Sequence, residues 1–137
     1  MRIFLIDDDR LSIFLTESML ALEGLTHKTK SYYSAEEALE ALSSGGDDTI
    51  PNLIFLDLNM PVMDGWAFLD ALAYTQLNLK IQKKCRIYIL TSSLDLSDTL
   101  RTKEYPLVSG LIHKPIKSED IEFIFSQYST QHQIPYK

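Results

Sequence analysis

Short apolar runs alternate with segments of helical periodicity along the whole chain. Four runs are mostly apolar and a fifth is more polar; together they cover residues 2–6, 26–32, 53–56, 86–90 and 108–112. Runs of this length, bounded by polar residues, are typical of strands. Between them, apolar residues recur every three or four positions, as on the core side of a helix. We therefore expect five strands connected by helices.

The helical pattern predicts five helices, over residues 11–23, 35–42, 66–74, 95–103 and 119–128. Asp9 is the expected N-cap of the first helix, and Ser34 begins the second as part of a capping box. Ser118 is expected to cap the last one. Residues 76–84 leave two interpretations open, a longer end of the preceding helix or a loop.

This alternation predicts an α/β fold with a parallel sheet covered by helices on both faces and right-handed crossovers. Lys28 and Lys30 in the more polar run suit an exposed edge strand, because lysines there discourage pairing with other chains. Trp66 is expected to be partly buried against the sheet. The chain has 137 residues and no repeat or linker, so we expect one domain over residues 1–128 and a frayed tail over residues 129–137.

Polar residues with potential chemistry stand at the ends of four predicted strands. They are Asp7, Asp8 and Asp9 after the first strand, Asp57 after the third, Thr91 after the fourth and Lys114 after the fifth. Alone, each is typical of a turn former, a helix cap or a solvated side chain. Ligands of open parallel sheets, however, bind beyond the carboxyl ends of the strands. If these strands lie side by side, carboxylates, a hydroxyl and an ammonium group meet in one cleft.

Such a constellation suits a hard cation and phosphoryl chemistry. Neighbouring carboxylates repel one another, and a divalent cation relieves that repulsion. Oxygen-only ligands favour Mg²⁺, whereas His27, His113 and His132 lack zinc-ligand spacing and are interpreted as surface or packing residues. A carboxylate beside Mg²⁺ can attack a phosphoryl group, and the cation, Lys114 and Thr91 would stabilise the charge on its oxygens.

Four segments resemble the motifs of a known family. They are residues 6–9 (IDDD), 55–65 (FLDLNMPVMDG), 89–93 (ILTSS) and 112–115 (IHKP). In this order and spacing they are similar to the receiver domain of two-component response regulators, in the CheY-like superfamily. The resemblance implies a flavodoxin-like, doubly wound (βα)5 fold with a five-stranded parallel sheet of order 2-1-3-4-5. It also implies a stand-alone receiver that signals through protein–protein contacts.

The resemblance assigns roles around a Mg²⁺ ion. It implies that Asp57 is both the phosphoacceptor and a metal ligand. Asp8 would bind the ion directly, and Asp7 would act mainly through water. Asn59 would offer its backbone carbonyl to the ion.

The resemblance also assigns roles around the phosphoryl group. Thr91 would move to donate a hydrogen bond to it, and Lys114 would form an ion pair with it. The peptide bond before Pro115 is expected to be cis. Leu111 departs from the family, which often has Phe or Tyr three positions before the lysine. That ring swings inward when the hydroxyl residue moves, so the departure puts an aromatic-switch output in question but not the phosphorylation chemistry. Ser93, like Asn59, resembles positions that tune phosphoryl lifetime.

Composition narrows the partners and the location. The formal net charge of -6 argues against nucleic acid as the main partner. Cys85 is the only cysteine, which fits a reducing compartment. No apolar run is long enough to span a membrane, and none resembles a signal peptide. A cytoplasmic location is therefore expected. The resemblance implies a histidine kinase or phosphotransfer protein as phosphodonor, an unidentified protein target, and a phosphoacceptor rather than an enzyme.

Two other functions stay open at this point. Residues 7–9 after an N-terminal strand resemble the Asp-x-Asp of haloacid-dehalogenase-type phosphatases. Those enzymes need a further acidic residue at a strand end after the lysine, whereas Glu119 and Asp120 look helical. The other alternative is a receiver-like interaction module that is never phosphorylated, against which the complete set of site residues argues. Turnover of a generic phosphate monoester would favour the phosphatase. A failure to bind Mg²⁺ would favour the interaction module.

Overall fold

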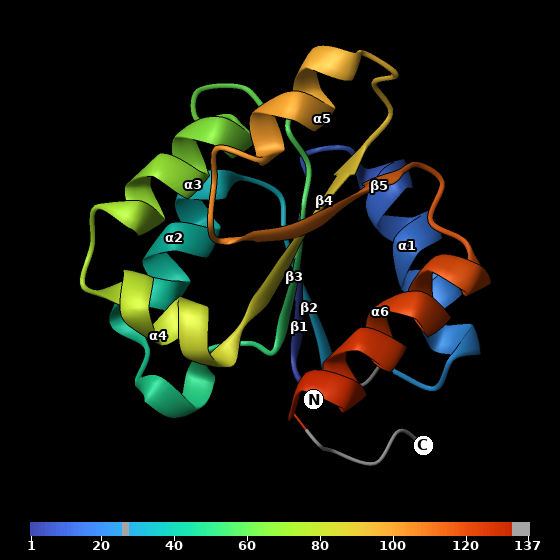
Figure 1. Cartoon of the computed structure of the whole chain (residues 1–137), viewed down its shortest axis with the longest axis horizontal. Helices are drawn as coiled ribbons and strands as arrows, with labels where there is room; N and C mark the ends of the chain where they lie inside the picture. Colours follow the sequence, from blue (N-terminus) through green and yellow to red (C-terminus); the bar gives the residue numbers. More distant parts are fainter. Residues whose placement is uncertain (26–27, 133–137) are drawn as a thin grey trace.

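The computed structural model describes residues 1–25 and 28–132 and contains one five-stranded parallel sheet (Figure 1). The strands are β1 (Ile3–Ile6), β2 (Thr29–Tyr32), β3 (Leu53–Leu56), β4 (Arg86–Thr91) and β5 (Val108–His113). Their order in the sheet is β2-β1-β3-β4-β5, and all four neighbouring pairs are parallel. The predicted fold class and strand order are therefore confirmed.

Helices cover both faces of this sheet. α1 (Arg10–Leu22) and α6 (Ser118–His132) lie on one face, and α2 (Ala35–Ser44), α3 (Gly65–Ala73) and α4 (Leu77–Lys84) lie on the other (Figure 1). A short 3₁₀ helix, η2 (Asp47–Thr49), follows α2, and α5 (Leu96–Thr102) follows β4. Within the described residues, no helix is long and apolar enough to cross a membrane.

Two hydrophobic cores result, because successive residues of each central strand point to opposite faces. Phe4 and Ile6 of β1 belong to the core under α2, α3 and α4. Ile3 and Leu5 belong to the core under α1 and α6. All four residues of β1, like all four of β3, are buried. The two central strands are thus fixed from both sides, and so are the positions at which they end.

The segment between α3 and β4 differs from both open interpretations. Residues 77–84 form a separate helix, α4, whose Ile81 is fully buried in the core. Thr75 interrupts the path from α3, since its hydroxyl donates to the carbonyl of Leu72 at 3.0 Å and accepts from the amide of Leu77 at 3.2 Å. A hydroxyl that bonds the backbone in this way competes with helix continuation.

The last helix differs from its prediction at both ends. Ser118 is not its cap but its first residue, and the Ser118 hydroxyl donates to the sulfur of Met19 at 3.5 Å. The capping bond runs from the amide of Lys117 to the carboxylate of Asp120 at 2.9 Å. α6 continues to His132, past its predicted end and into the expected tail. Residues 133–137 of that tail lie outside the described residues.

Other local predictions hold with smaller changes. The Asp9 carboxylate accepts from the amides of Leu11 and Ser12, and the Ser34 hydroxyl accepts from Glu37, as expected of N-caps. The edge strand starts at Thr29 rather than residue 26, and residues 26–27, which include His27, lie outside the described residues.

Gly65 lets the start of α3 lie directly against the end of β3. A β-carbon at Gly65 would be 2.6 Å from the carbonyl oxygen of Asp57 and 2.9 Å from the Cα atom of Leu58. Both neighbours are backbone atoms, which cannot move aside cheaply. The Gly65 amide also donates to the carbonyl of Leu58 at 2.9 Å, which holds the two segments in contact.

We therefore expect Gly65→Ala to lower the free energy of unfolding by about 1–3 kcal/mol, because overpacking outweighs the better helix propensity of alanine. Urea denaturation followed by circular dichroism measures this. Gly46→Ala is the control, since a β-carbon at Gly46 would meet nothing within 4 Å. Equal stability of the Gly65 variant and the wild-type protein would contradict the close approach described above.

Candidate functional site

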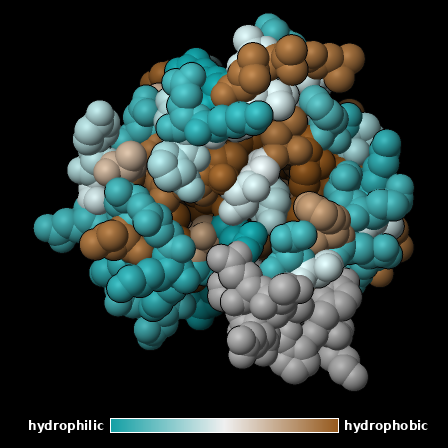
Figure 2. Space-filling view, in the orientation of Figure 1, coloured by the Kyte–Doolittle hydropathy of each residue, from teal (hydrophilic) through white to brown (hydrophobic). Residues whose placement is uncertain are grey.

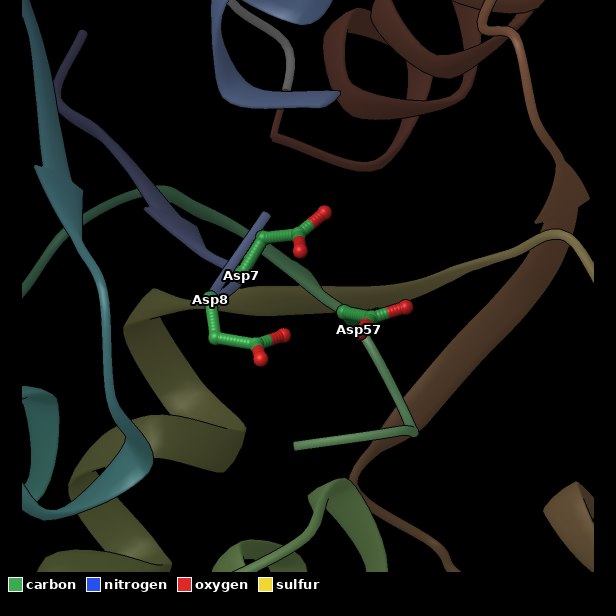
Figure 3. Close-up of side chains that lie close together, drawn as sticks. All are labelled: Asp7, Asp8 and Asp57. Carbon is green, nitrogen blue, oxygen red and sulfur yellow. The ribbon is translucent and has the colours of Figure 1, made fainter. Parts of the chain in front are cut away.

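Three carboxylates converge where β1 and β3 end side by side. The two strands pair with Ile6 opposite Leu56, so Asp7 and Asp57 leave the sheet at the same level. The amide of Asp57 donates to the carbonyl of Ile6 at 2.9 Å, which extends the pairing to the acidic residue itself. Asp7, Asp8 and Asp57 each offer a carboxylate oxygen within 4.8 Å of the others. Figure 3 shows the three side chains projecting from these strand ends.

Lys114 joins this group from the end of β5. Its Nζ atom lies 2.7 Å from Oδ2 of Asp7 and 3.2 Å from Oδ1 of Asp57. The other oxygen of Asp7 accepts from the amide of Asp9 at 2.9 Å, so hydrogen bonds hold both of its oxygens. The peptide bond between Lys114 and Pro115 is cis, as predicted.

Thr91 ends β4 and is fully buried. Its carbonyl accepts from the amide of Lys114 at 2.8 Å, which ties the ends of β4 and β5 together. Its hydroxyl oxygen accepts from the amide of Ser93 at 3.0 Å. The structure thus places the hydroxyl and the ammonium residue at the ends of neighbouring strands, at the same edge of the sheet as the carboxylates.

Burial and charge shift the protonation of this group. Desolvation raises the pKa of Asp57 to about 6, and the nearby Asp7 carboxylate adds to the effect while Lys114 opposes it. For Lys114, burial acts to lower the pKa, but the hydrogen bond to Asp7 and the charge of Asp57 outweigh it and the pKa is raised. At neutral pH, Asp57 is therefore mostly an anion and Lys114 a cation.

The residues present fit a Mg²⁺ ion. The donor set consists of oxygens only, as this cation prefers. Desolvation and then the neighbouring carboxylate charges raise the pKa of Asp57, and a divalent cation would offset those charges. Asp7 and Asp57 are buried while Asp8 is exposed, so the group has a solvent-facing side where water ligands can complete the coordination. Asn59 is exposed in the segment after β3. Its carbonyl as a ligand stays a prediction.

The segment between Asp57 and α3 contains one strained residue that the sequence did not reveal. Val62 has φ 69°, which is rare for a β-branched residue, and its side chain is 97% exposed. A short turn accompanies it, in which the amide of Met63 donates to the carbonyl of Pro61 at 2.8 Å. Backbone strain of this kind concentrates at functional loops, because the surrounding structure must hold it in place.

Two further residues near the site, Trp66 and Arg101, differ from what the sequence indicated. Trp66 was expected to be partly buried, and Arg101 was not expected to have a role. Trp66 is only 7% exposed, so it is more than partly buried. Its ring lies under the guanidinium of Arg101, with Cζ 4.4 Å from the ring centroid, and 5.3 Å from the ring of Tyr105. Arg101 gave no signal in the sequence, because its contact joins elements far apart in the chain.

The acidic residues after Lys114 lie where they were predicted. Glu119 and Asp120 occupy the first turn of α6 rather than a strand end. These two residues therefore do not supply the further acidic residue at a strand end that a haloacid-dehalogenase-type phosphatase would need.

Comparisons with known proteins agree with this architecture. The family model described as the response regulator receiver domain matches residues 3–125. No curated protein sequence matches the chain significantly.

Several solved structures share this fold. A response regulator receiver protein from Dyadobacter fermentans is 26% identical, with a TM-score of 0.81 over 93% of this chain and 96% of that chain. A two-component response regulator from Legionella pneumophila is 23% identical, with a TM-score of 0.77 over 94% and 98%. The chemotaxis protein CheY4 of Vibrio cholerae is 19% identical, with a TM-score of 0.70 over 92% and 96%.

The raised pKa of Asp57 predicts that Asp57→Asn stabilises the metal-free protein at neutral pH. The folded protein binds more protons than the unfolded chain between about pH 4 and pH 6, so wild-type stability falls as pH rises through this window. We expect the variant to be about 1–3 kcal/mol more stable near pH 7, with the difference fading near pH 4. Lys114 retains Asp7 as its partner in the variant.

Urea denaturation in the presence of a metal chelator, repeated across this pH range, measures the effect. Asp48→Asn is the matched control, because Asp48 is an exposed aspartate and its substitution should leave stability unchanged. A variant less stable than the wild-type protein at neutral pH would refute the idea that Asp57 is held in its charged form at a cost.

Proposed function

Because this chain belongs to the response regulator receiver domain family, we propose that it accepts a phosphoryl group on the carboxylate of Asp57, with Mg²⁺ as cofactor. The observation that carries the proposal is the convergence of three carboxylates and the Lys114 ammonium at the carboxyl ends of neighbouring parallel strands. The phosphodonor would be a histidine kinase or a phosphotransfer protein of a two-component system.

Asp57 is suited to act as the nucleophile. With a pKa of about 6 its carboxylate is mostly ionised at neutral pH, yet more basic than an ordinary aspartate. One of its oxygens bonds to phosphorus as the bond from phosphorus to the imidazole nitrogen of the donor breaks. The imidazole keeps that electron pair and takes up a proton from water. The product is an acyl phosphate on Asp57.

Lys114 and Thr91 would hold the transferred group. The Lys114 Nζ atom is already 3.2 Å from Oδ1 of Asp57, so a small movement brings it to a phosphoryl oxygen. The Thr91 hydroxyl, at the neighbouring strand end, would donate to another. Asp8 and Asp57, with Asp7 through water and the Asn59 carbonyl, would hold the Mg²⁺ ion, which when bound neutralises negative charge on the phosphoryl oxygens.

We propose that the protein acts in the cytoplasm as a phosphoacceptor that assists its own phosphorylation and dephosphorylation, rather than as an enzyme with a separate substrate. Its signal would pass to a protein target by direct contact. Neither nucleic acid nor a membrane is proposed as a partner.

Phosphorylation is tested by incubating the protein with Mg²⁺ and a small phosphodonor such as phosphoramidate and measuring intact mass. We expect the mass of one added phosphoryl group on the wild-type protein. The labelled fraction should fall to the background level in Asp57→Asn and in the wild-type protein without Mg²⁺. Asp9→Asn is the matched control: it changes an adjacent carboxyl but preserves the N-cap of α1, so its labelling should equal that of the wild-type protein. Full labelling of the Asp57 variant would reject this acceptor.

Mg²⁺ binding is tested separately by isothermal titration calorimetry. We expect Asp8→Asn to weaken Mg²⁺ binding at least about tenfold, since it removes one anionic ligand from the exposed side of the site. Asp9→Asn should bind the ion as the wild-type protein does. If neither the wild-type protein nor Asp9→Asn binds Mg²⁺, the chain is better described as an interaction module that is not phosphorylated.

A further inference from the structure

A groove runs beside the edge strand β2, between this strand and the C-terminal part of α2. We call it the β2–α2 groove. Its volume is about 510 Å³, and its walls come from β1, β2, α2 and η2 together with the residues that flank them. The residues proposed for phosphorylation do not line it. Pockets of this size hold small organic molecules in many proteins. The proposed function therefore gives this concave surface no role.

Small residues at the end of α2 leave the groove open. Ala41, Ser44 and Gly45 line it on the side opposite β2, where larger side chains would fill the space. Gly45 ends the helix and leaves room for the hydroxyl of Thr49, which a β-carbon at this position would overlap. That hydroxyl donates to the carbonyl of Gly46 at 2.7 Å and so holds the turn into η2. The helix and the turn after it thus shape one wall.

The opposite wall is positively charged. Phe4 pairs in register with Lys30, so residues 2, 4, 28 and 30 point to the same face of the sheet. Arg2, Lys28 and Lys30 all line the groove. In the described ranges, 1–25 and 28–132, no ion pair involves any of these three cations. Like charges gathered on one wall repel one another and attract an anion.

Protection of the sheet edge explains the two lysines but not Arg2. Lysines on an edge strand discourage pairing with other chains. Arg2, however, precedes β1, which is an inner strand. Its backbone amide donates to Oδ1 of Asn52 at 2.8 Å, and its guanidinium donates to the carbonyl of Asp48. A guanidinium has five N–H groups, so Arg2 is held at the groove by one of them and can offer others to a ligand.

Nearby negative groups do not balance this charge. Asp47 of η2 pairs with Lys80 of α4, whose Nζ atom lies 2.6 Å from Oδ1 of the aspartate. The C-terminal end of α2 carries about half a negative charge, a fraction of the three positive ones. α4 adds Lys83 and Lys84 in its last turn, and Figure 2 shows a mostly hydrophilic surface where Figure 1 places this helix. A local excess of positive charge therefore remains in a chain whose net charge is -6.

Two aromatic rings give the groove an apolar part. Phe4 and Tyr32 both line it, and their ring centroids lie 4.9 Å apart. The Nζ atom of Lys30 lies 5.6 Å from the centroid of the Tyr32 ring, so the apolar and the charged parts of the groove meet there. A ligand that suits both parts carries an anionic group on a compact organic body.

We propose that the β2–α2 groove binds a small organic phosphate. Arg2, Lys28 and Lys30 bind the phosphate group, because a dianion accepts charge-assisted hydrogen bonds from guanidinium and ammonium groups and matches several cations better than a single carboxylate does. The organic part lies against Tyr32 and Ala41. This site is separate from the phosphorylation site, and neither proposal depends on the other.

The metal-free full chain is titrated with adenosine 5′-monophosphate (AMP), with adenosine and with inorganic phosphate, and amide chemical shifts are followed by NMR. AMP should shift the amides of residues 28–30 and 44–45 to saturation, with a Kd of about 1 mM or lower. Adenosine should shift none of them, because it lacks the phosphate. Inorganic phosphate should bind at least about threefold more weakly than AMP, because it lacks the organic part. The amides of Asp57 and Lys114 should keep their free values.

Three variants separate charge from shape. Lys30→Met removes one cation while keeping a side chain of similar length, and should weaken AMP binding at least about fivefold. Ser44→Phe leaves the charge unchanged and fills the groove from an exposed position, and should also weaken binding at least about fivefold. Lys83→Met is the matched control. It removes the same charge from an exposed position on α4 outside the groove, so it should bind AMP as the wild-type protein does.

Each outcome decides part of the proposal. No response of the groove to AMP or to inorganic phosphate, or an equal response to AMP and adenosine, would overturn it. Inorganic phosphate that binds as tightly as AMP would show that the groove takes free phosphate and that the organic part is wrong. If Lys83→Met weakens binding as Lys30→Met does, or if Ser44→Phe leaves it unchanged, the attraction comes from the overall charge and the groove is refuted. None of these results changes the proposal for Asp57.

Discussion

Backbone pairing between β1 and β3 forces together carboxylates that repel one another. Asp7 and Asp57 follow residues that are register partners, so neither can leave without breaking the pairing of strands buried on both faces. Desolvation, and after it the charge of Asp7, raises the pKa of Asp57, and Lys114 offsets part of this rise through contacts to both carboxylates. The close approach of these carboxylates is therefore unfavourable by itself. The hydrophobic cores on either side of the sheet hold the two strand ends, and with them the carboxylates, in place.

Strain in the surrounding backbone lies on the same edge of the sheet. Val62 adopts a positive φ, and Gly65 occupies a space that no larger residue could share with Asp57. Both lie in the segment that leads from the acidic residue to α3, whereas the strands themselves are regular over residues 3–6 and 53–56. A regular sheet thus supports a strained loop, and the packing of the sheet holds the residues of that loop in conformations that are unfavourable in isolation.

Sequence patterns predicted the parts of this molecule that local physics determines. The β3 boundaries, the Asp9 cap and the meeting of Asp8 with Asp57 follow from apolar runs and from the rule that parallel strands end at one edge. What the sequence could not indicate depends on distant contacts. α4 exists because Ile81 finds a place in the core, and Ser118 bonds Met19 rather than capping its helix. Arg101 has a partner only once α5 and α3 are brought together.

α5 contributes little to the stability of this edge of the sheet. Of its seven residues only Thr102 is buried, while Leu96 and Leu100 are largely exposed. A helix this short is held by the contacts at its ends, among them the hydrogen bond from the amide of Ser93 to the hydroxyl oxygen of Thr91 and the stacking of Arg101 on Trp66. Each contact contributes about 0.5–1.5 kcal/mol, far less than the burial of the central strands. The edge of the sheet is therefore fixed by β1 and β3, and α5 follows it with low local stability.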